Sequence, residues 1–213
     1  ANSAFCYCSS LTGELKLPKN LESIGREAFR GCTGFTGELV IPDKITAIPY
    51  GTFSGMTGIE AVTINKNVTS IYTASNEAST FYNMPGVKTV TFLGEVPPSA
   101  SDRWYSIFCG MSNLETVYVP KGTYKAYSDA YREGLAETVR LKETGGDDFV
   151  ITDGELTGYM GDSTEVTIPE SVTKIGASAF EKAQIKKIII PPEVTEIGEK
   201  AFQNSSLEVV EFS

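Results

Sequence analysis

The sequence repeats itself, and this constrains the fold more than any other feature. A phenylalanine, in most copies preceded by a small residue, recurs at Phe5, Phe29, Phe53, Phe81, Phe108, Phe180 and Phe202. The first five are separated by 24, 24, 28 and 27 residues, and the last two by 22 residues. A unit of about 23 residues is too short to bury its own apolar side chains. Consecutive units must therefore stack on one another and share a single core.

Each unit combines two patterns. Alternating apolar residues, such as Leu39 and Ile41, predict a short β-strand with one buried face. A proline often follows, as at Pro42, and ends the strand because it has no N–H to donate. The segment Ile-Gly-x-x-Ala-Phe predicts a helical turn. Stacked units should place their strands in parallel, ~4.8 Å apart, along one side of a solenoid.

The units resemble a known family of repeats. LKLPKNLESIGREAFRGCTGF, VTIPESVTKIGASAFEKAQI and IIIPPEVTEIGEKAFQNSSL are similar to the BspA-like class of leucine-rich repeat. The resemblance covers nearly the whole chain and implies an α/β repeat solenoid. This would be a right-handed leucine-rich repeat superhelix with a parallel β-sheet face and short helical or irregular convex segments. It also implies a protein exported to the bacterial cell surface, and some members of the family are adhesins.

The repeat pattern breaks once, so we expect two arrays. Residues 116–141 begin as a repeat but continue with tyrosines at helical spacing, and this predicts a terminating unit for a first array over residues 1–141. The polar stretch 142–148 is typical of a linker. Residues 149–213 should form a second array, capped by a hairpin around Asp153-Gly154. Both ends fall within a unit, so we expect the native chain to continue at least beyond the C-terminal end.

Composition limits the function classes. The chain has 18 Lys and Arg against 27 Asp and Glu, which gives a net charge of −9 and disfavours nucleic acid and anionic membranes as partners. Histidine is absent, so the usual activation of a nucleophile and the usual zinc ligands are missing. No apolar run is long enough to insert into a membrane. We expect no enzyme activity, catalytic residue, cofactor or metal site.

Cysteines and acidic residues are the remaining candidates for chemistry. Cys8 and Cys32 share a repeat position with methionines, so we interpret them as core thiols. Cys6 and Cys109 follow the conserved repeat phenylalanine directly and are the more reactive candidates. The acids near the linker, which include Asp147, Asp148, Asp153, Glu155 and Asp162, match no calcium-binding loop and are interpreted as solvated.

The outward residues of the strands are the main candidates for binding. Side chains alternate between the two faces of a strand, so the residue between two buried ones points away from the core. These residues are Lys16, Val40, Thr63, Thr91, Tyr118, Thr167 and Ile189. In solenoids such a row forms an extended recognition surface. The alternative is that threonine, valine, isoleucine and tyrosine occur there because they favour strands.

A second candidate is the irregular segment of the fourth unit, which contains Trp104 and Tyr105. Both side chains offer a large rigid surface with a polar tip, which favours binding sites. Trp104 could equally fill the core where the regular Val-x-x-Ile pattern is missing.

The sequence thus predicts a non-catalytic module, displayed on the bacterial cell surface, that binds a protein through its strand face. The partner should be a host matrix protein or another cell-surface protein. The alternatives are a structural spacer for other domains and a glycan-binding module.

Overall fold

A computed structural model gives the fold for residues 1–73, 79–100, 107–131, 134–136, 138–144 and 148–213. The chain divides into two compact units, unit 1 (Ala1–Leu141) and unit 2 (Lys142–Ser213). Each unit has its own hydrophobic core. In the described part of the chain, no helix has the length and apolar character needed to cross a membrane.

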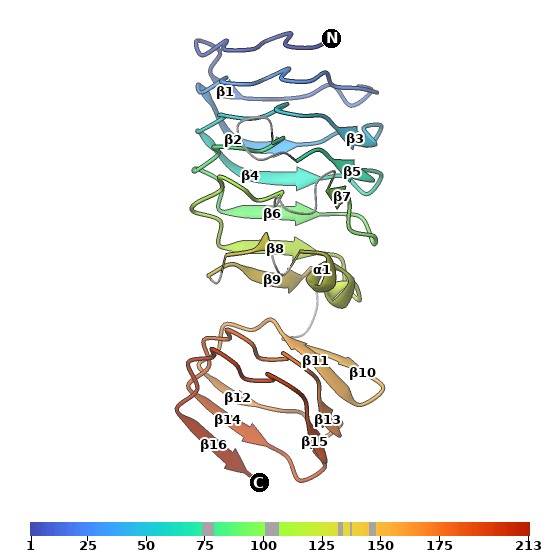
Figure 1. Cartoon of the computed structure of the whole chain (residues 1–213), viewed down its shortest axis with the longest axis vertical. Helices are drawn as coiled ribbons and strands as arrows, with labels where there is room; N and C mark the ends of the chain where they lie inside the picture. Colours follow the sequence, from blue (N-terminus) through green and yellow to red (C-terminus); the bar gives the residue numbers. More distant parts are fainter. Residues whose placement is uncertain (74–78, 101–106, 132–133, 137, 145–147) are drawn as a thin grey trace. The chain divides into compact units, whose positions relative to one another are not determined.

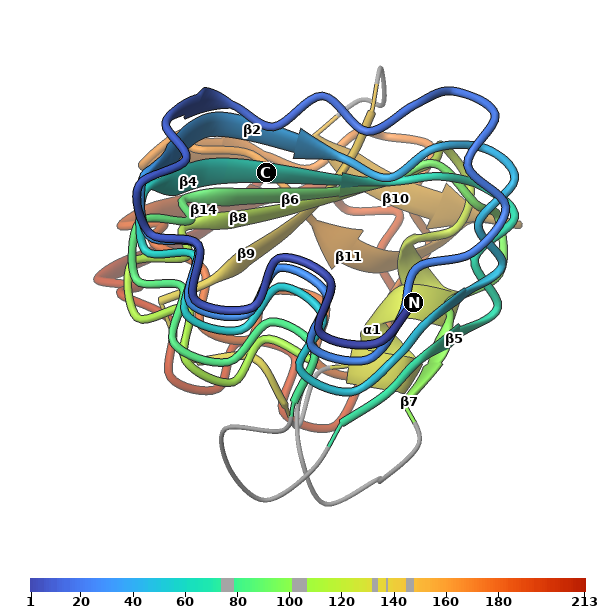
Figure 2. The ribbon, with the colours of Figure 1, turned by 90° about the horizontal axis from the view of Figure 1, so that it is seen from above.

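Unit 1 is a stack of turns with a parallel sheet along one side (Figure 1). Each turn contributes one strand, and the order in the sheet follows the order in the chain: β1 (Gly13–Glu14), β2 (Phe35–Val40), β4 (Ile59–Ile64), β6 (Thr89–Phe92), β8 (Thr116–Val119) and β9 (Arg140–Glu143). A second, shorter sheet contains β3 (Ala47–Ile48), β5 (Ser70–Ile71) and β7 (Ser99–Ala100). Seen from above, successive turns of unit 1 follow nearly the same path (Figure 2).

A column of phenylalanine rings runs through the core of unit 1. The rings of Phe5 and Phe29 stack at 5.2 Å, those of Phe29 and Phe53 at 5.9 Å, and those of Phe53 and Phe81 at 5.9 Å. Phe53 lies inside the column and is fully buried, whereas Phe5 at its end is 46% exposed. The column explains the spacing of the repeat, because each turn must return its phenylalanine to the same place.

The segment around each phenylalanine is a series of tight turns, so the predicted helical turn is wrong. The residues two positions before and two positions after the phenylalanine have a left-handed backbone. For Phe29 these are Glu27, with a φ of 55°, and Gly31, with a φ of 70°. A right-handed helix cannot continue through such residues. The N–H groups of Glu27, Phe29 and Gly31 instead donate to Tyr50, Thr52 and Ser54 of the next turn, at 2.8 to 3.0 Å. The hydrogen bonds between turns therefore extend beyond the sheets.

A single helix, α1 (Tyr124–Tyr131), covers the end of the core of unit 1 within the described residues. Its Tyr127 hydroxyl donates to the carbonyl oxygen of Gly94 at 2.7 Å, and its Tyr131 hydroxyl donates to that of Pro98 at 2.5 Å. Burial raises the pKa of both phenols. The two tyrosines fill the space that another repeat would occupy and satisfy the carbonyls of the irregular loop beside it.

Unit 2 begins with an antiparallel hairpin of β10 (Phe149–Thr152) and β11 (Glu155–Tyr159), whose turn is Asp153-Gly154. Both turn residues have positive φ, of 50° and 80°, as a two-residue hairpin turn of this kind requires. Strand β11 then pairs in parallel with β13 (Lys174–Ile175), and β13 pairs with β15 (Glu196–Ile197). The hairpin thus provides the first strand of a repeat sheet.

The other sheet of unit 2 contains the regular repeat strands β12 (Glu165–Thr167), β14 (Lys187–Ile190) and β16 (Val209–Phe212), all parallel. The rings of Phe180 and Phe202 stack at 5.1 Å in its core, as their counterparts do in unit 1. The predicted repeat solenoid with parallel sheets is confirmed, and the structure shows that it contains little helix.

Replacing Phe53 by alanine should lower the free energy of unfolding by about 3–5 kcal/mol, because it leaves a cavity between two stacked rings. Phe212→Ala is the control, since Phe212 is 74% exposed and its loss should cost far less. Urea unfolding of the two variants measures the difference. Equal stabilities would show that the column does not support the fold.

Replacing Lys182 by glycine should raise the free energy of unfolding by about 0.5–1 kcal/mol. Lys182 has a φ of 62° at the position held by Gly31 and Gly55, and glycine adopts this conformation without steric cost. Lys182→Ala removes the same side chain but keeps the Cβ atom, so it should not stabilise the fold. An alanine variant more stable than the glycine variant would contradict the argument.

Candidate functional site

The outward side of the main sheet of unit 1 forms a continuous row of side chains. Strand pairing places Val40 beside Thr63, Thr63 beside Thr91, and Thr91 beside Tyr118. Val40 is 47% exposed although its neighbours Leu39 and Ile41 are almost completely buried. The sequence-predicted outward positions of these four strands therefore lie in register on one surface.

A second row lies beside the first. Its members, which the sequence analysis did not list, lie two residues earlier in each strand and pair in the same way: Glu38, Ala61, Thr89 and Thr116. The alternation in Thr-Val-Thr at 89–91 predicts this row, because the two threonines on either side of a buried valine point outward together. A register shift at Glu38 obscures it in the earlier turns. We call these eight side chains the strand face of unit 1.

Glu38 is the one charged member of these eight side chains. The hydroxyl of Thr63 donates a hydrogen bond of 2.6 Å to its carboxylate, so the charge is tied to the neighbouring turn. The other seven are threonine, alanine, valine and tyrosine. They give a flat surface that is mildly apolar and carries hydroxyl groups along its length.

Lys16 is exposed between Leu15 and Leu17, which pack against the core, but the strand pairing of the first turn does not extend to it. Strand β1 ends at Glu14, and the Lys16 ammonium pairs with the Glu14 carboxylate at 3.0 Å. Both side chains are exposed. Strand β1 lies at the edge of the sheet and pairs with β2 over Gly13 and Glu14.

The corresponding surface of unit 2 differs in charge. Thr167 lies beside Ile189, and Ile189 lies beside Glu211. Lys187 and Glu211 form an ion pair of 2.7 Å across the sheet, and the hydrogen bond that the Lys187 ammonium donates to Glu211 raises the pKa of Lys187. The lysine of this face thus pairs with a glutamate of the neighbouring strand.

The shorter sheet of unit 2 shows the same behaviour. The Lys174 ammonium lies 3.2 Å from Glu196 and 3.7 Å from Glu155, one on each neighbouring strand. The hydrogen bond that the Lys174 ammonium donates to Glu196 raises the pKa of Lys174, and the charge of Glu155 raises it further. All three groups are largely open to water, so the pairs contribute little to stability.

The other predicted candidates that lie within the described residues do not assemble into a site. Trp104 and Tyr105 lie outside the described residues. Cys32 is fully buried and its thiol donates to the carbonyl oxygen of Phe5, while Cys6, Cys8 and Cys109 are half-buried. Within the described ranges, no three histidine, cysteine or acidic side chains gather in a geometry that could hold a metal ion.

Comparison with known families identifies the repeat. The model of the "BspA type Leucine rich repeat region" matches six copies, over residues 1–136 and 158–213. The chain belongs to the BspA-type leucine-rich repeat family. The similarity predicted from the repeat units is thus confirmed, and it covers both units. Among curated proteins, no sequence matches the chain.

Two solved structures resemble this leucine-rich repeat protein weakly. One is a leucine-rich repeat protein from Bacteroides ovatus, with 18% identity, a TM-score of 0.40, and coverage of all of this chain and 63% of that one. The other is a leucine rich cell surface protein from Faecalibacterium prausnitzii, with 20% identity, a TM-score of 0.33, and coverage of 100% and 57%. The chain therefore spans about 60% of the length of these proteins.

The Cys32 thiol should react more slowly with Ellman's reagent than the other three thiols. Burial raises its pKa, so at pH 8 less thiolate is present than for an exposed cysteine, and its 0% exposure blocks the reagent. Its reaction should become fast only on unfolding. In Cys32→Ala, the slow phase should disappear while the faster phases stay. An unchanged slow phase would contradict the assignment.

Proposed function

We propose that this leucine-rich repeat module is displayed on the bacterial cell surface and binds a protein partner, a host matrix protein or another cell-surface protein, through the strand face of unit 1. The observation that carries the proposal is the pair of outward rows in register, of which seven of eight side chains are uncharged. Surface display rests on what membership of the family implies. The module is not proposed to catalyse a reaction, because leucine-rich repeats generally serve as scaffolds.

The strand face suits a broad, shallow contact. Hydrogen bonds on both sides fix its backbone before a partner binds. Binding therefore costs little conformational entropy. Val40 and Tyr118 offer apolar contact area at its two ends, and the threonine hydroxyls between them can donate and accept hydrogen bonds. A surface of this kind favours a folded protein, because affinity comes from many weak contacts over a large area.

The charge arrangement of unit 2 favours a second role. Its outward lysines are paired with acids on adjacent strands, as Lys187 is with Glu211. A surface whose charges are already satisfied gains little from a partner. We propose that unit 2 acts as a spacer that holds unit 1 away from the point at which the protein is attached to the cell.

The double variant Val40→Glu, Tyr118→Ala should weaken binding to the partner by at least about tenfold, because it places a charge on the strand face and removes its largest side chain. The measurement is a binding screen of the chain against immobilised extracellular matrix proteins, followed by titration of each protein that binds. Thr167→Glu is the matched control, since it adds the same charge to the outward side of unit 2.

Three outcomes decide the proposal. Loss of binding in the double variant with normal binding in Thr167→Glu supports it. Normal binding in the double variant would show that the partner binds elsewhere than on the strand face. Absence of binding to every protein in the screen would favour a spacer role for the whole chain.

A further inference from the structure

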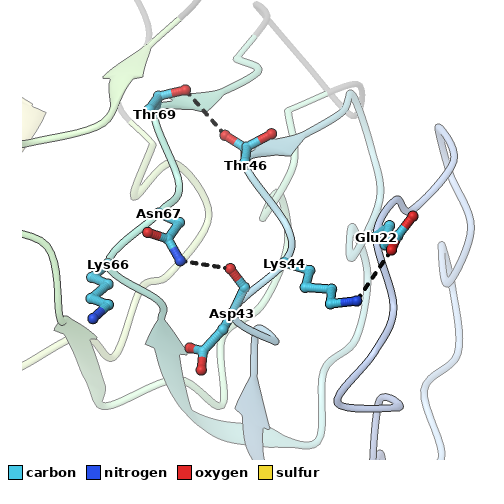
Figure 3. Close-up of a pocket in the computed structure, with 7 residues that line it drawn as sticks. All are labelled: Glu22, Asp43, Lys44, Thr46, Lys66, Asn67 and Thr69. Carbon is cyan, nitrogen blue, oxygen red and sulfur yellow. Dashed lines mark hydrogen bonds and ion pairs between the residues drawn. The ribbon is translucent and has the colours of Figure 1, made fainter.

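An open pocket lies at the corner of unit 1, on the turns that follow the main strands (Figure 3). Three consecutive turns contribute to it. We call it the corner pocket, and its lining residues are Glu22, Asp43, Lys44, Thr46, Lys66, Asn67 and Thr69. None of these side chains is aromatic or large and apolar, so the chemistry of the pocket differs from that of the strand face.

Hydrogen bonds between turns hold the pocket in shape. The Asn67 amide donates to the Asp43 carbonyl oxygen at 2.8 Å, and the Thr69 hydroxyl donates to the Thr46 carbonyl oxygen at 3.2 Å. Beneath them, Asn65 is buried, and its side-chain oxygen accepts the N–H of Asn67 at 2.7 Å. The loop that carries Lys66 and Asn67 is therefore fixed before any ligand binds.

Asn65 replaces the proline that ends the strand in several other turns. Its amide donates to the carbonyl oxygens of Pro42 and Ile45, at 2.6 and 3.0 Å. One side chain thus ties two neighbouring turns together directly below the corner pocket.

Two charged groups of the pocket remain available to a ligand. Lys44 pairs with Glu22 at 3.2 Å, but among the described residues neither the Asp43 carboxylate nor the Lys66 ammonium has an ion-pair partner. Figure 3 shows the Asp43 carboxylate between the side chains of Lys44 and Lys66 in that view. A strong acceptor and a strong donor thus line the same pocket and are both open to solvent.

We propose that the corner pocket binds a neutral glycan through two neighbouring hydroxyl groups of a sugar ring. A sugar hydroxyl donates one hydrogen bond and accepts others, so it needs an acceptor and a donor close together. Asp43 supplies the acceptor and Lys66 the donor, and both bonds are charge-assisted. The lining contains two acids and two bases, so it offers no net attraction to an ionic ligand.

A peptide fits this pocket less well than a sugar. Protein contacts are anchored by aromatic or large apolar side chains that fill a dry pocket, whereas the corner pocket is open and is lined by charged and polar residues. The proposal is independent of the proposed function, because the pocket shares no residue with the strand face.

The test is an array of neutral oligosaccharides of mannose, galactose, glucose and N-acetylglucosamine, with sialylated and sulfated glycans on the same slide. Each glycan that binds is then titrated with the chain and its variants. Asp43→Ala and Lys66→Met should each weaken binding of the neutral glycan at least tenfold without changing the melting temperature. Lys19→Met is the matched control, because Lys19 is exposed and lies outside the pocket.

The strand-face variant Tyr118→Ala separates this proposal from the proposed function. It should leave glycan binding unchanged, whatever its effect on a protein partner. The proposal is overturned if no neutral glycan on the array binds, if only acidic glycans bind, or if binding survives in both Asp43→Ala and Lys66→Met. It is also overturned if Tyr118→Ala alone removes glycan binding, since the sugar would then lie on the strand face.

Discussion

Backbone hydrogen bonds between consecutive turns are the interaction on which the rest of this structure depends. They join the strands of both sheets and also the tight turns around each phenylalanine, where Phe29 donates to Thr52 and Phe53 donates to Thr80. Each turn therefore presents nearly its whole backbone to the next. Side chains of equivalent residues must then fall into columns, and only residues that stack well on their own kind suit the inward columns.

The same constraint leaves the outward columns free for function. In unit 1 the outward rows are almost uncharged, whereas in unit 2 lysines and glutamates on adjacent strands pair with one another. The same repeat builds both units, and the outward residues that differ between them do not support the core. A repeat fold can therefore give two neighbouring units different surfaces without changing how either one folds.

Local patterns explain which parts could be predicted. Alternation in Leu39-Val40-Ile41 fixes which side chain is buried, because a strand allows only two faces. The turns around the phenylalanines were predicted incorrectly, because Glu27, Ser178 and Lys200 adopt left-handed conformations that their own types do not favour. The available signal was Gly51 in the same column, together with the glycines at 31, 55 and 110, which lie four positions later in the repeat. Stacking against the neighbouring turn imposes this conformation on residues that are not glycine.

The sequence by itself determined the repeat, its family, the phenylalanine column and the outward positions of the regular strands, because these follow from periods that each unit carries locally. Only the tertiary structure decided the register between turns, the end of the first paired strand before Lys16 and the presence of Asp43 and Lys66 in one pocket. Those features depend on where consecutive turns lie over one another. The physical reason is that the length of each turn and the shifts within its strands set this overlap, and no single unit contains that information.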